Sequence, residues 1–177
     1  MINAIDVQGT RLFLLDVPNP EWADCDAFKL ALMKGGIEVL CPQLIGALTR
    51  SRPTKKVRCM HPNMTKEIMG VVEYGQFSME MFFDHADVLG QKKLTDAFNN
   101  KTPIVIVILS PDWSAIFTYA NVMKDGISFP DGSKVGYSVV VSPFGGFHRC
   151  FLGFMDCIGP GCLPLEFTDA FTGEFQI

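Results

Sequence analysis

The stretch that most constrains the fold is residues 75–109, in which a strand, a helix and a second strand are expected in succession. Its first part alternates Phe77, Met79, Met81 and Phe83 with Gln76, Ser78, Glu80 and Phe82. A period of two places neighbouring side chains on opposite faces of a strand. We therefore expect a strand with one mostly apolar face toward a core and one more polar face.

The second part predicts a helix. Asp84 stands where an N-cap carboxylate would accept hydrogen bonds from free backbone N–H groups. The expected apolar face consists of Ala86, Gly90, Leu94, Ala97 and Phe98, with Leu89 beside them. Asn99 and Asn100 predict the end of the helix, because Asn tolerates a left-handed backbone. Asp84 and Asp87 are interpreted as charges at the helix N-terminus rather than as an acid–base pair.

The third part, residues 103–109, reads PIVIVIL and is apolar at every position. It is too short to span a membrane and rich in β-branched residues, so it predicts a strand that is covered on both faces. The helix is expected to lie across the sheet that these two strands help to build.

The remaining segments are mostly strand-like, at residues 9–15, 37–40, 71–83, 115–123 and 134–142. One or two helical turns fit residues 27–34. The pattern predicts one domain, residues 1–177, that is mainly β: an antiparallel β-sandwich or barrel with one helix packed on the sheet. Three further segments are expected: an inserted N-terminal loop at 16–40, a long β-hairpin at 45–60 with its tip at 51–54, and a C-terminal arm at 146–177 that packs on a neighbouring subunit.

The composition favours extensive contacts. Apolar residues make up 48% and charged residues 19% of the chain. This charged fraction is low for a globular monomer, which indicates a large core or apolar surface buried against partners. No apolar run approaches the roughly 20 residues of a membrane span. No secretory signal is apparent at the N-terminus. The net charge of −4 argues against a general nucleic-acid binder.

The charges are unevenly distributed. Residues 1–44 hold six acids and three bases, residues 45–70 six bases and one acid, and residues 144–177 four acids and one base. The basic run consists of Arg50, Arg52, Lys55, Lys56 and Arg58. Three interpretations stay open: a hairpin that reaches an acidic surface of the next identical subunit, a solvated hairpin tip, or a phosphate-binding site. The run lacks the aromatic residues that stack on nucleic acid bases.

The sequence offers little for chemistry. It has no P-loop, no G-x-S-x-G and no H-E-x-x-H motif, so we expect no enzyme, no catalytic residues, no metal and no cofactor. The six cysteines form no C-x-x-C pair, and free thiols in a reducing compartment are expected. A zinc site from His148, Cys157 and Cys162 has an unusual ligand spacing. A Cys150 nucleophile with His148 as its base lacks a visible orienting carboxylate.

Three segments, taken in order, resemble a known family. They are Ile45-Gly46 with the following hairpin, the run from Tyr74-Gly75 to Phe98 (YGQFSMEMFFDHADVLGQKKLTDAF), and the run from Phe129-Pro130 to Gly145. Together they cover roughly residues 40–146. Their order and spacing resemble the tail tube proteins (major tail proteins) of long-tailed bacteriophages, of the non-contractile, siphovirus-like kind.

The resemblance implies a β-sandwich with one helix, which assembles into hexameric rings that stack into a hollow tube. The genome leaves the capsid through this tube. The implied partners are the chain itself, the tape measure, tail terminator and distal tail proteins, and duplex DNA in transit. The implied place is the virion tail, assembled in the host cytoplasm. Alternatives are a tail terminator, a tube ring like that of type VI secretion, or a small Cys-dependent enzyme.

DNA must slide through such a tube, and exposed Lys or Arg would bind its phosphates. The polar face with Gln76, Ser78 and Glu80 is therefore the candidate channel lining. The other interpretation is that this face meets solvent or the helix. The basic run from Arg50 to Arg58 is the candidate ring-stacking surface, since head-to-tail stacking uses two different surfaces of one subunit.

Overall fold

A computed structural model of the chain describes residues 9–16, 25–58, 65–84, 86–87, 89–130 and 134–153. These residues hold eleven strands and two helices. In chain order the elements are β1 (Arg11–Asp16), α1 (Cys25–Gly35), β2 (Ile37–Val39), β3 (Pro42–Ile45), β4 (Arg50–Ser51), β5 (Thr54–Arg58), β6 (Thr65–Met69), β7 (Glu73–Tyr74), β8 (Phe77–Phe82), α2 (Gly90–Asn100), β9 (Ile104–Leu109), β10 (Ser114–Ser128) and β11 (Gly136–Phe151).

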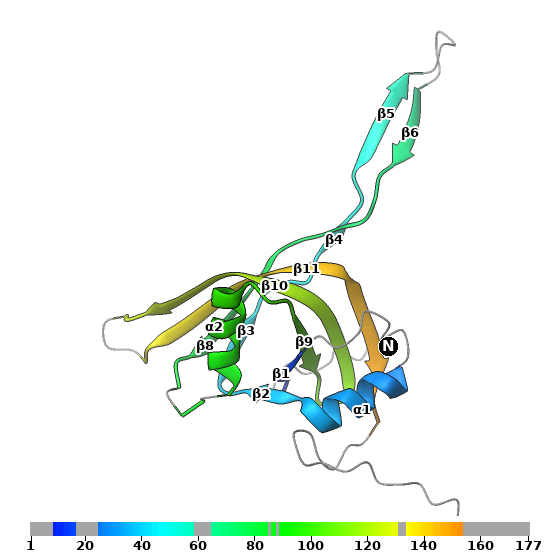
Figure 1. Ribbon diagram of the computed structural model, residues 1–177. Coiled ribbons are helices and arrows are strands. Elements are labelled where there is room, and N and C mark those ends of the chain that lie inside the picture. Colours follow the sequence, from blue (N-terminus) through cyan, green and yellow to red (C-terminus); the bar gives the residue numbers. More distant parts are fainter. Residues whose placement is uncertain are drawn as a thin grey trace, which may run out of the picture.

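Seven strands form one antiparallel sheet in the order β2-β1-β9-β10-β11-β8-β3. Strands β10 and β11 are its longest members and curve across the whole body (Figure 1). The expected antiparallel, mainly β architecture is confirmed. The sheet is open, however, with β2 and β3 at its edges, so the described strands do not close into a barrel.

Alternating side chains build two cores, one on each face of the sheet. In β9 every residue is buried, as the apolar run predicts. Ile104, Ile106 and Ile108 join the core beneath α2, whereas Val105 and Val107 join the core beneath α1. A strand that is apolar at every position is therefore explained by a helix packed on each side of it.

Two helices are present among the described residues, which corrects the expectation of one. α1 buries Phe28 and Leu32 completely, and the Phe28 ring stacks on Phe117 with the ring centroids 3.9 Å apart. The expected loop at 16–40 therefore contains a helix and the edge strand β2 that belong to the core. Its residues 17–24 lie outside the described part of the chain.

The expected hairpin at residues 45–60 has the wrong boundaries. Arg50 and Ser51 pair with Tyr74 and Glu73, and residues 54–58 pair with residues 65–69. Residues 51–54 therefore lie along one side of the hairpin and not at its tip. Residues 59–64, which connect the two strands, lie outside the described part of the chain.

The expected boundary of a C-terminal arm at residue 146 is also wrong. β11 continues to Phe151, because a register shift between Thr118 and Tyr119 of β10 accommodates Gly145 and Gly146. Both glycines have a positive φ, of 78° and 104°, which favours glycine over other residues. Residues 154–177 lie outside the described part of the chain.

Helix α2 begins later than expected. Its first residue is Gly90, and Asp84 instead accepts a hydrogen bond from the Ala86 backbone N–H at 2.9 Å. The helix ends at Asn100, and the left-handed residue is Lys101, with φ of 54°, rather than an asparagine. Leu94 and Ala97 are buried as expected, whereas Leu89 and Phe98 are exposed.

Tyr137 joins α2 to the sheet and predicts an alkaline loss of stability. Its hydroxyl oxygen lies 2.9 Å from the Thr95 hydroxyl oxygen, and burial raises its pKa above the ordinary value. Since the folded state holds this proton more tightly, its contribution is complete below about pH 10 and lost above. We expect Tyr137→Phe to cost about 1 kcal/mol at pH 7. Urea unfolding from pH 7 to 11 should show the difference from the wild type shrinking above about pH 10; a constant difference would contradict this.

Candidate functional site

The face of β8 that carries Ser78 and Glu80 is covered by neither helix. Phe77, Met79 and Met81 point to the core beneath α2, so these two polar residues point to the opposite face. Gln76 directly precedes the strand. On that face α1 packs at the far end of the sheet, on a core that includes Phe13 and Phe117. Gln76 and Glu80 are exposed and Ser78 is half-buried.

The strand register adds residues to this face that sequence reasoning missed. Ser138 lies opposite Glu80, and Val140 lies opposite Ser78. Beyond them, Gly126 pairs with Ser138 and Lys124 pairs with Val140. We call this surface the polar face; its members are Leu44, Gln76, Ser78, Glu80, Phe82, Lys124, Gly126, Ser128, Ser138 and Val140.

The polar face carries few charges. Glu80 is its one carboxylate and Lys124 its one ammonium group. At the end of the face, Lys134 places its Nζ 5.0 Å from the centre of the Phe82 ring, a cation–π contact. Phe82 is therefore partly covered by a charged side chain. The remaining residues are small, neutral or apolar, so the charged groups on or beside the face are Glu80, Lys124 and Lys134.

Two unpaired strand edges flank the polar face. Strand β9 pairs with β10 only over residues 115–120, so residues 121–128 pair only with β11 among the described strands. Strand β3 pairs only with β8. Unpaired N–H and C=O groups at such edges can accept another strand. The four-stranded part of the sheet, β3-β8-β11-β10, therefore has an edge free on each side.

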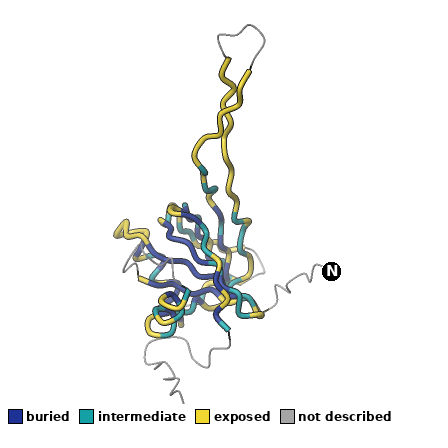
Figure 2. Tube along the Cα trace, turned by 90° about the vertical axis from the view of Figure 1, so that its right-hand side faces the viewer, coloured by how far each residue is buried: buried dark blue, intermediate teal, exposed yellow. Residues whose placement is uncertain are grey.

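The candidate stacking surface follows a ribbon that projects far from the body (Figure 1). Arg50 lies at its base, in a hollow shared with Phe147 and Arg149 of the body, and the other four basic residues lie further along it. Strands β4 to β7 form this ribbon, which we call the arm, residues 50–74. Every described residue of β5 and β6 is exposed, in contrast to the buried strands of the body (Figure 2). A two-stranded ribbon with no core is marginally stable alone.

The arm has two unlike faces. Lys55, Val57, Lys66 and Ile68 share one face, on which Val57 and Ile68 are 37% and 51% exposed. The other face carries Met69, which is 69% exposed, together with Arg58 and with Lys56 and Glu67, whose charged atoms lie 3.4 Å apart. The first face combines two exposed apolar groups with two lysines and no carboxylate, so we assign it to docking.

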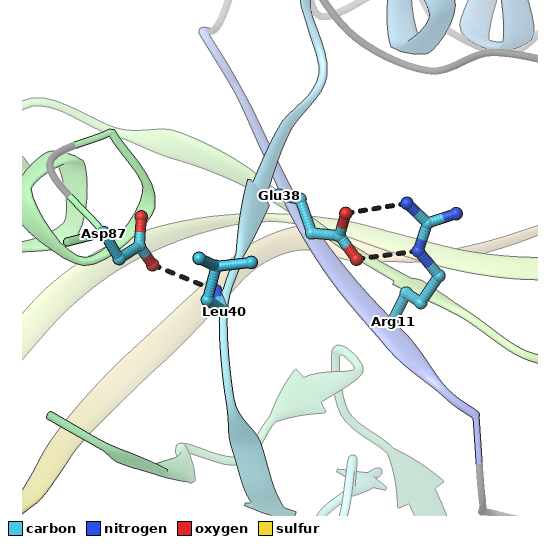
Figure 3. A network of polar contacts seen from close by, with 4 residues as sticks. All are labelled: Arg11, Glu38, Leu40 and Asp87. Atoms are coloured by element: carbon cyan, nitrogen blue, oxygen red, sulfur yellow. Dashed lines mark hydrogen bonds and ion pairs between the residues drawn. The ribbon is translucent and has the colours of Figure 1, made fainter. Parts of the chain in front are cut away.

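A buried polar network fixes α2 against the edge of the sheet (Figure 3). One oxygen of Asp87 accepts from the Gly90 backbone N–H at 2.7 Å, and the other accepts from the Leu40 backbone N–H at 2.9 Å. Gly90 is required here, because a Cβ would come within 2.6 Å of the Glu38 carbonyl oxygen. Glu38 in turn accepts two 2.7 Å hydrogen bonds from Arg11, which raise the pKa of that guanidinium.

Asp87 should matter more for stability than its neighbour Asp84. Asp87→Asn replaces one acceptor with a donor that faces a backbone N–H, so we expect a loss of about 2–4 kcal/mol. Asp84→Ala removes one exposed turn hydrogen bond and should cost below about 1 kcal/mol. Urea unfolding of both variants measures the difference. Equal losses would remove the anchoring role assigned to Asp87.

The structure does not support Cys150 and His148 as a nucleophile and base. Cys150 forms a disulfide with Cys25, which corrects the expectation of free thiols and leaves Cys150 without a nucleophilic thiol. His148 stacks on the Phe117 ring with centroids 5.0 Å apart. In the described part of the chain, no group of three His, Cys, Asp or Glu side chains could hold a metal ion. Cys157 and Cys162, the other expected zinc ligands, lie outside it. No described helix is long and apolar enough to cross a membrane.

Comparison with solved structures identifies the class of fold. A chain of the anti-feeding prophage (AFP) baseplate matches over 87% of this chain and 100% of its own, with a TM-score of 0.60 and 12% identity. A chain of an empty gene transfer agent (GTA) tail with C6 symmetry matches over 83% and 99%, with a TM-score of 0.57 and 10% identity. No family model and no curated protein matches the sequence.

These matches place the chain among proteins with the tail tube fold, as the sequence resemblance implied. The SPP1 tail tube matches over nearly the whole of both chains, 98% of this one and 91% of its own. Its TM-score is 0.58 and its identity 15%. The shared property is the fold of phage tail tube proteins.

Proposed function

We propose that this chain is the structural subunit of a hollow phage tail tube, of the non-contractile, siphovirus-like kind. Hexameric rings stack into the tube, and duplex DNA passes through it into the host. The observation that carries the proposal is the four-stranded sheet with a polar, uncovered face and a free edge on each side. Such a unit is unfinished as a monomer and complete when copies surround a channel.

The free edges explain how a ring closes. The exposed part of β10 on one subunit pairs with β3 of the next, which satisfies the unpaired backbone groups of both strands. Six subunits then contribute twenty-four strands, whose spacing of ~4.8 Å spans a circle about 37 Å across before tilt. A channel of this size admits a duplex after side chains are subtracted. The C6 symmetry of the GTA tail, which shares this fold, supports the choice of six.

The polar face then becomes the channel wall. Gln76, Ser78 and Glu80 line it together with Ser138 from β11. A wall that is nearly neutral lets DNA slide, because few bound counterions are exchanged for protein cations. In this arrangement α2 lies outside the barrel and braces it through the Asp87 network.

The arm joins successive rings. Residues 50–74 carry six bases and two acids, a net charge of +4. Because the whole chain has a net charge of −4, the rest of it has a net charge of −8. A basic arm and an acidic body on one subunit suit head-to-tail stacking. Arg50, Arg52, Lys55, Lys56 and Arg58 supply the charge, and Val57 with Ile68 supplies apolar area.

A second candidate is a ring of another injection machine, a function favoured by the match to the AFP baseplate chain. A tail terminator ring or a type VI secretion tube ring belongs to the same group of possibilities. In the phage tail, the further partners are the tape measure, tail terminator and distal tail proteins. The place is the virion, after assembly in the host cytoplasm.

Negative-stain microscopy of the purified protein, combined with sedimentation over a concentration series, tests the proposal. Hollow tubes of constant width that appear above a critical concentration are the expected result. Discrete rings that never stack would favour the second candidate. A monomer at all concentrations would overturn both.

A further inference from the structure

The disulfide between Cys25 and Cys150 joins the start of α1 to the end of β11. Cys25 is the first residue of α1, and Cys150 lies near the end of β11, opposite Ala115 of β10. The two residues are 125 positions apart. The bond therefore closes a covalent loop around the arm, α2 and most of the sheet, and leaves only residues 1–24 and 151–177 outside it.

Helix α1 does not depend on this bond for its place. Its buried side chains, Phe28 and Leu32, already fill the core with Phe13 and Phe117. The same contacts hold Cys25 beside Cys150 when both are thiols. The fold thus aligns the two sulfur atoms before any oxidation, and the disulfide adds stability to a structure that exists without it.

The two cysteines differ in exposure. Cys150 is buried, with 7% of its surface exposed, whereas Cys25 is half-buried at the start of its helix. The partial exposure of Cys25 offers a small thiol or disulfide its approach to the pair, and burial shields Cys150 from direct attack. A more exposed cysteine beside a buried one is the arrangement of a bond that exchanges with low-molecular-weight thiols.

We propose that Cys25 and Cys150 form a redox-controlled latch, open as two thiols in a reducing compartment and closed as a disulfide in an oxidising medium. Newly made subunits would then be held by packing alone, and subunits exposed to an oxidising medium would gain a covalent lock between α1 and β11. The proposal does not require the chain to form tubes.

Closure balances with a small disulfide such as oxidised glutathione. The Cys25 thiolate attacks one sulfur of glutathione disulfide and releases one glutathione thiolate. The Cys150 thiolate then attacks the Cys25 sulfur of the mixed disulfide and releases the second glutathione thiolate. The protein loses two electrons and two thiol protons, and one glutathione disulfide becomes two glutathiones. Reduction runs the same steps in reverse, starting at Cys25.

The test uses the full chain as a dilute monomer in glutathione buffers from a cytosolic to an oxidising ratio. Alkylation during unfolding in denaturant, followed by peptide mass spectrometry, reports each thiol independently of its burial, and circular dichroism reports the Tm. We expect Cys25 and Cys150 to be alkylated after the reducing buffer and protected as a disulfide after the oxidising one. The folded, oxidised protein should melt roughly 5–15 °C above the folded, reduced one.

Variants separate the latch from other thiol effects. Cys25→Ser should abolish the Tm difference between the buffers, and Cys41→Ser, which removes an exposed free thiol, should retain it. Alkylation of both residues in the oxidising buffer, protection of both at the cytosolic ratio, or a Tm difference that survives in Cys25→Ser would each overturn the proposal. Because the measurements use dilute monomer, a failure to form tubes leaves their outcome unchanged.

Discussion

Replacing residues 52–72 with an Asn-Gly turn is expected to abolish tubes while the subunit stays folded. Ser51 and Glu73 are directly paired, so a two-residue turn can connect them. The removed residues include all of β5 and β6, whose described residues are exposed and contribute to neither core. The Tm of the monomer should therefore change by less than about 3 °C. Without the arm, the concentration needed for tubes should rise more than about 100-fold, equivalent to a loss above ~2.7 kcal/mol per contact.

Single changes on the arm distinguish its two faces. Lys55→Glu and Ile68→Asp alter the face that we assign to docking, and each should raise the critical concentration about tenfold. Glu67→Gln on the other face, which breaks only an exposed ion pair, is the matched control and should have little effect. The double reversal Lys55→Glu/Lys56→Glu should weaken polymerisation further without unfolding the subunit. Sedimentation at two salt concentrations measures these effects, and unchanged tube length in the double variant would contradict a stacking role.

Placing arginine on the polar face is expected to turn the channel into a DNA-binding surface. Ser78→Arg with Ser138→Arg adds two charges per subunit, and therefore twelve per ring of six. The affinity for a short duplex should then fall steeply with salt, because each neutralised phosphate releases counterions. Wild-type tubes should retain little duplex at about 50 mM salt, whereas the variant should retain it and release it near ~200 mM. Filter retention of a labelled duplex with preformed tubes gives both curves.

The matched control places the same charge on the other side of the wall. Asn99 and Asn100 are exposed residues of α2, which packs on the face of the sheet opposite to the polar face. Asn99→Arg with Asn100→Arg also adds two charges per subunit and should change duplex retention less than the pair on the polar face. Equal retention by the two variants would mean that the polar face does not line the channel.

The strands that could be predicted from the sequence are those that bury one face or both faces in a core. Strand β9 was evident because burial on both faces leaves no polar position. The alternation of β8 correctly separated Phe77, Met79 and Met81 from the polar residues between them. The boundaries of the arm were predicted wrongly for the opposite reason: the arm is exposed on both faces, so its sequence has no hydrophobic period. Pro53 suggested the tip of a hairpin, but it lies between β4, which pairs with β7, and β5, which pairs with β6.

Other features depend on distant contacts that a local pattern does not contain. The pairing of Cys25 with Cys150 requires α1 to lie against the end of β11. Lys124 and Ser138 join Glu80 on the polar face only through the register of β10, β11 and β8. The continuation of β11 beyond Phe144 was hidden because Gly145 and Gly146 interrupt the period at the register shift. For α1, the spacing of Phe28 and Leu32 indicated a helix. These two positions span only about one turn, so they did not show that the helix runs from Cys25 to Gly35.

A cryo-electron microscopy map of the polymer tests the central claim most directly. The account predicts a hollow tube with six subunits per ring and an inner wall of continuous β-structure. Glu80 and Ser138 should face the channel, α2 should lie outside the wall, and residues 50–74 should contact the next ring. A map in which the polar face points outward, or in which β3 and the free part of β10 remain unpaired between subunits, would contradict it.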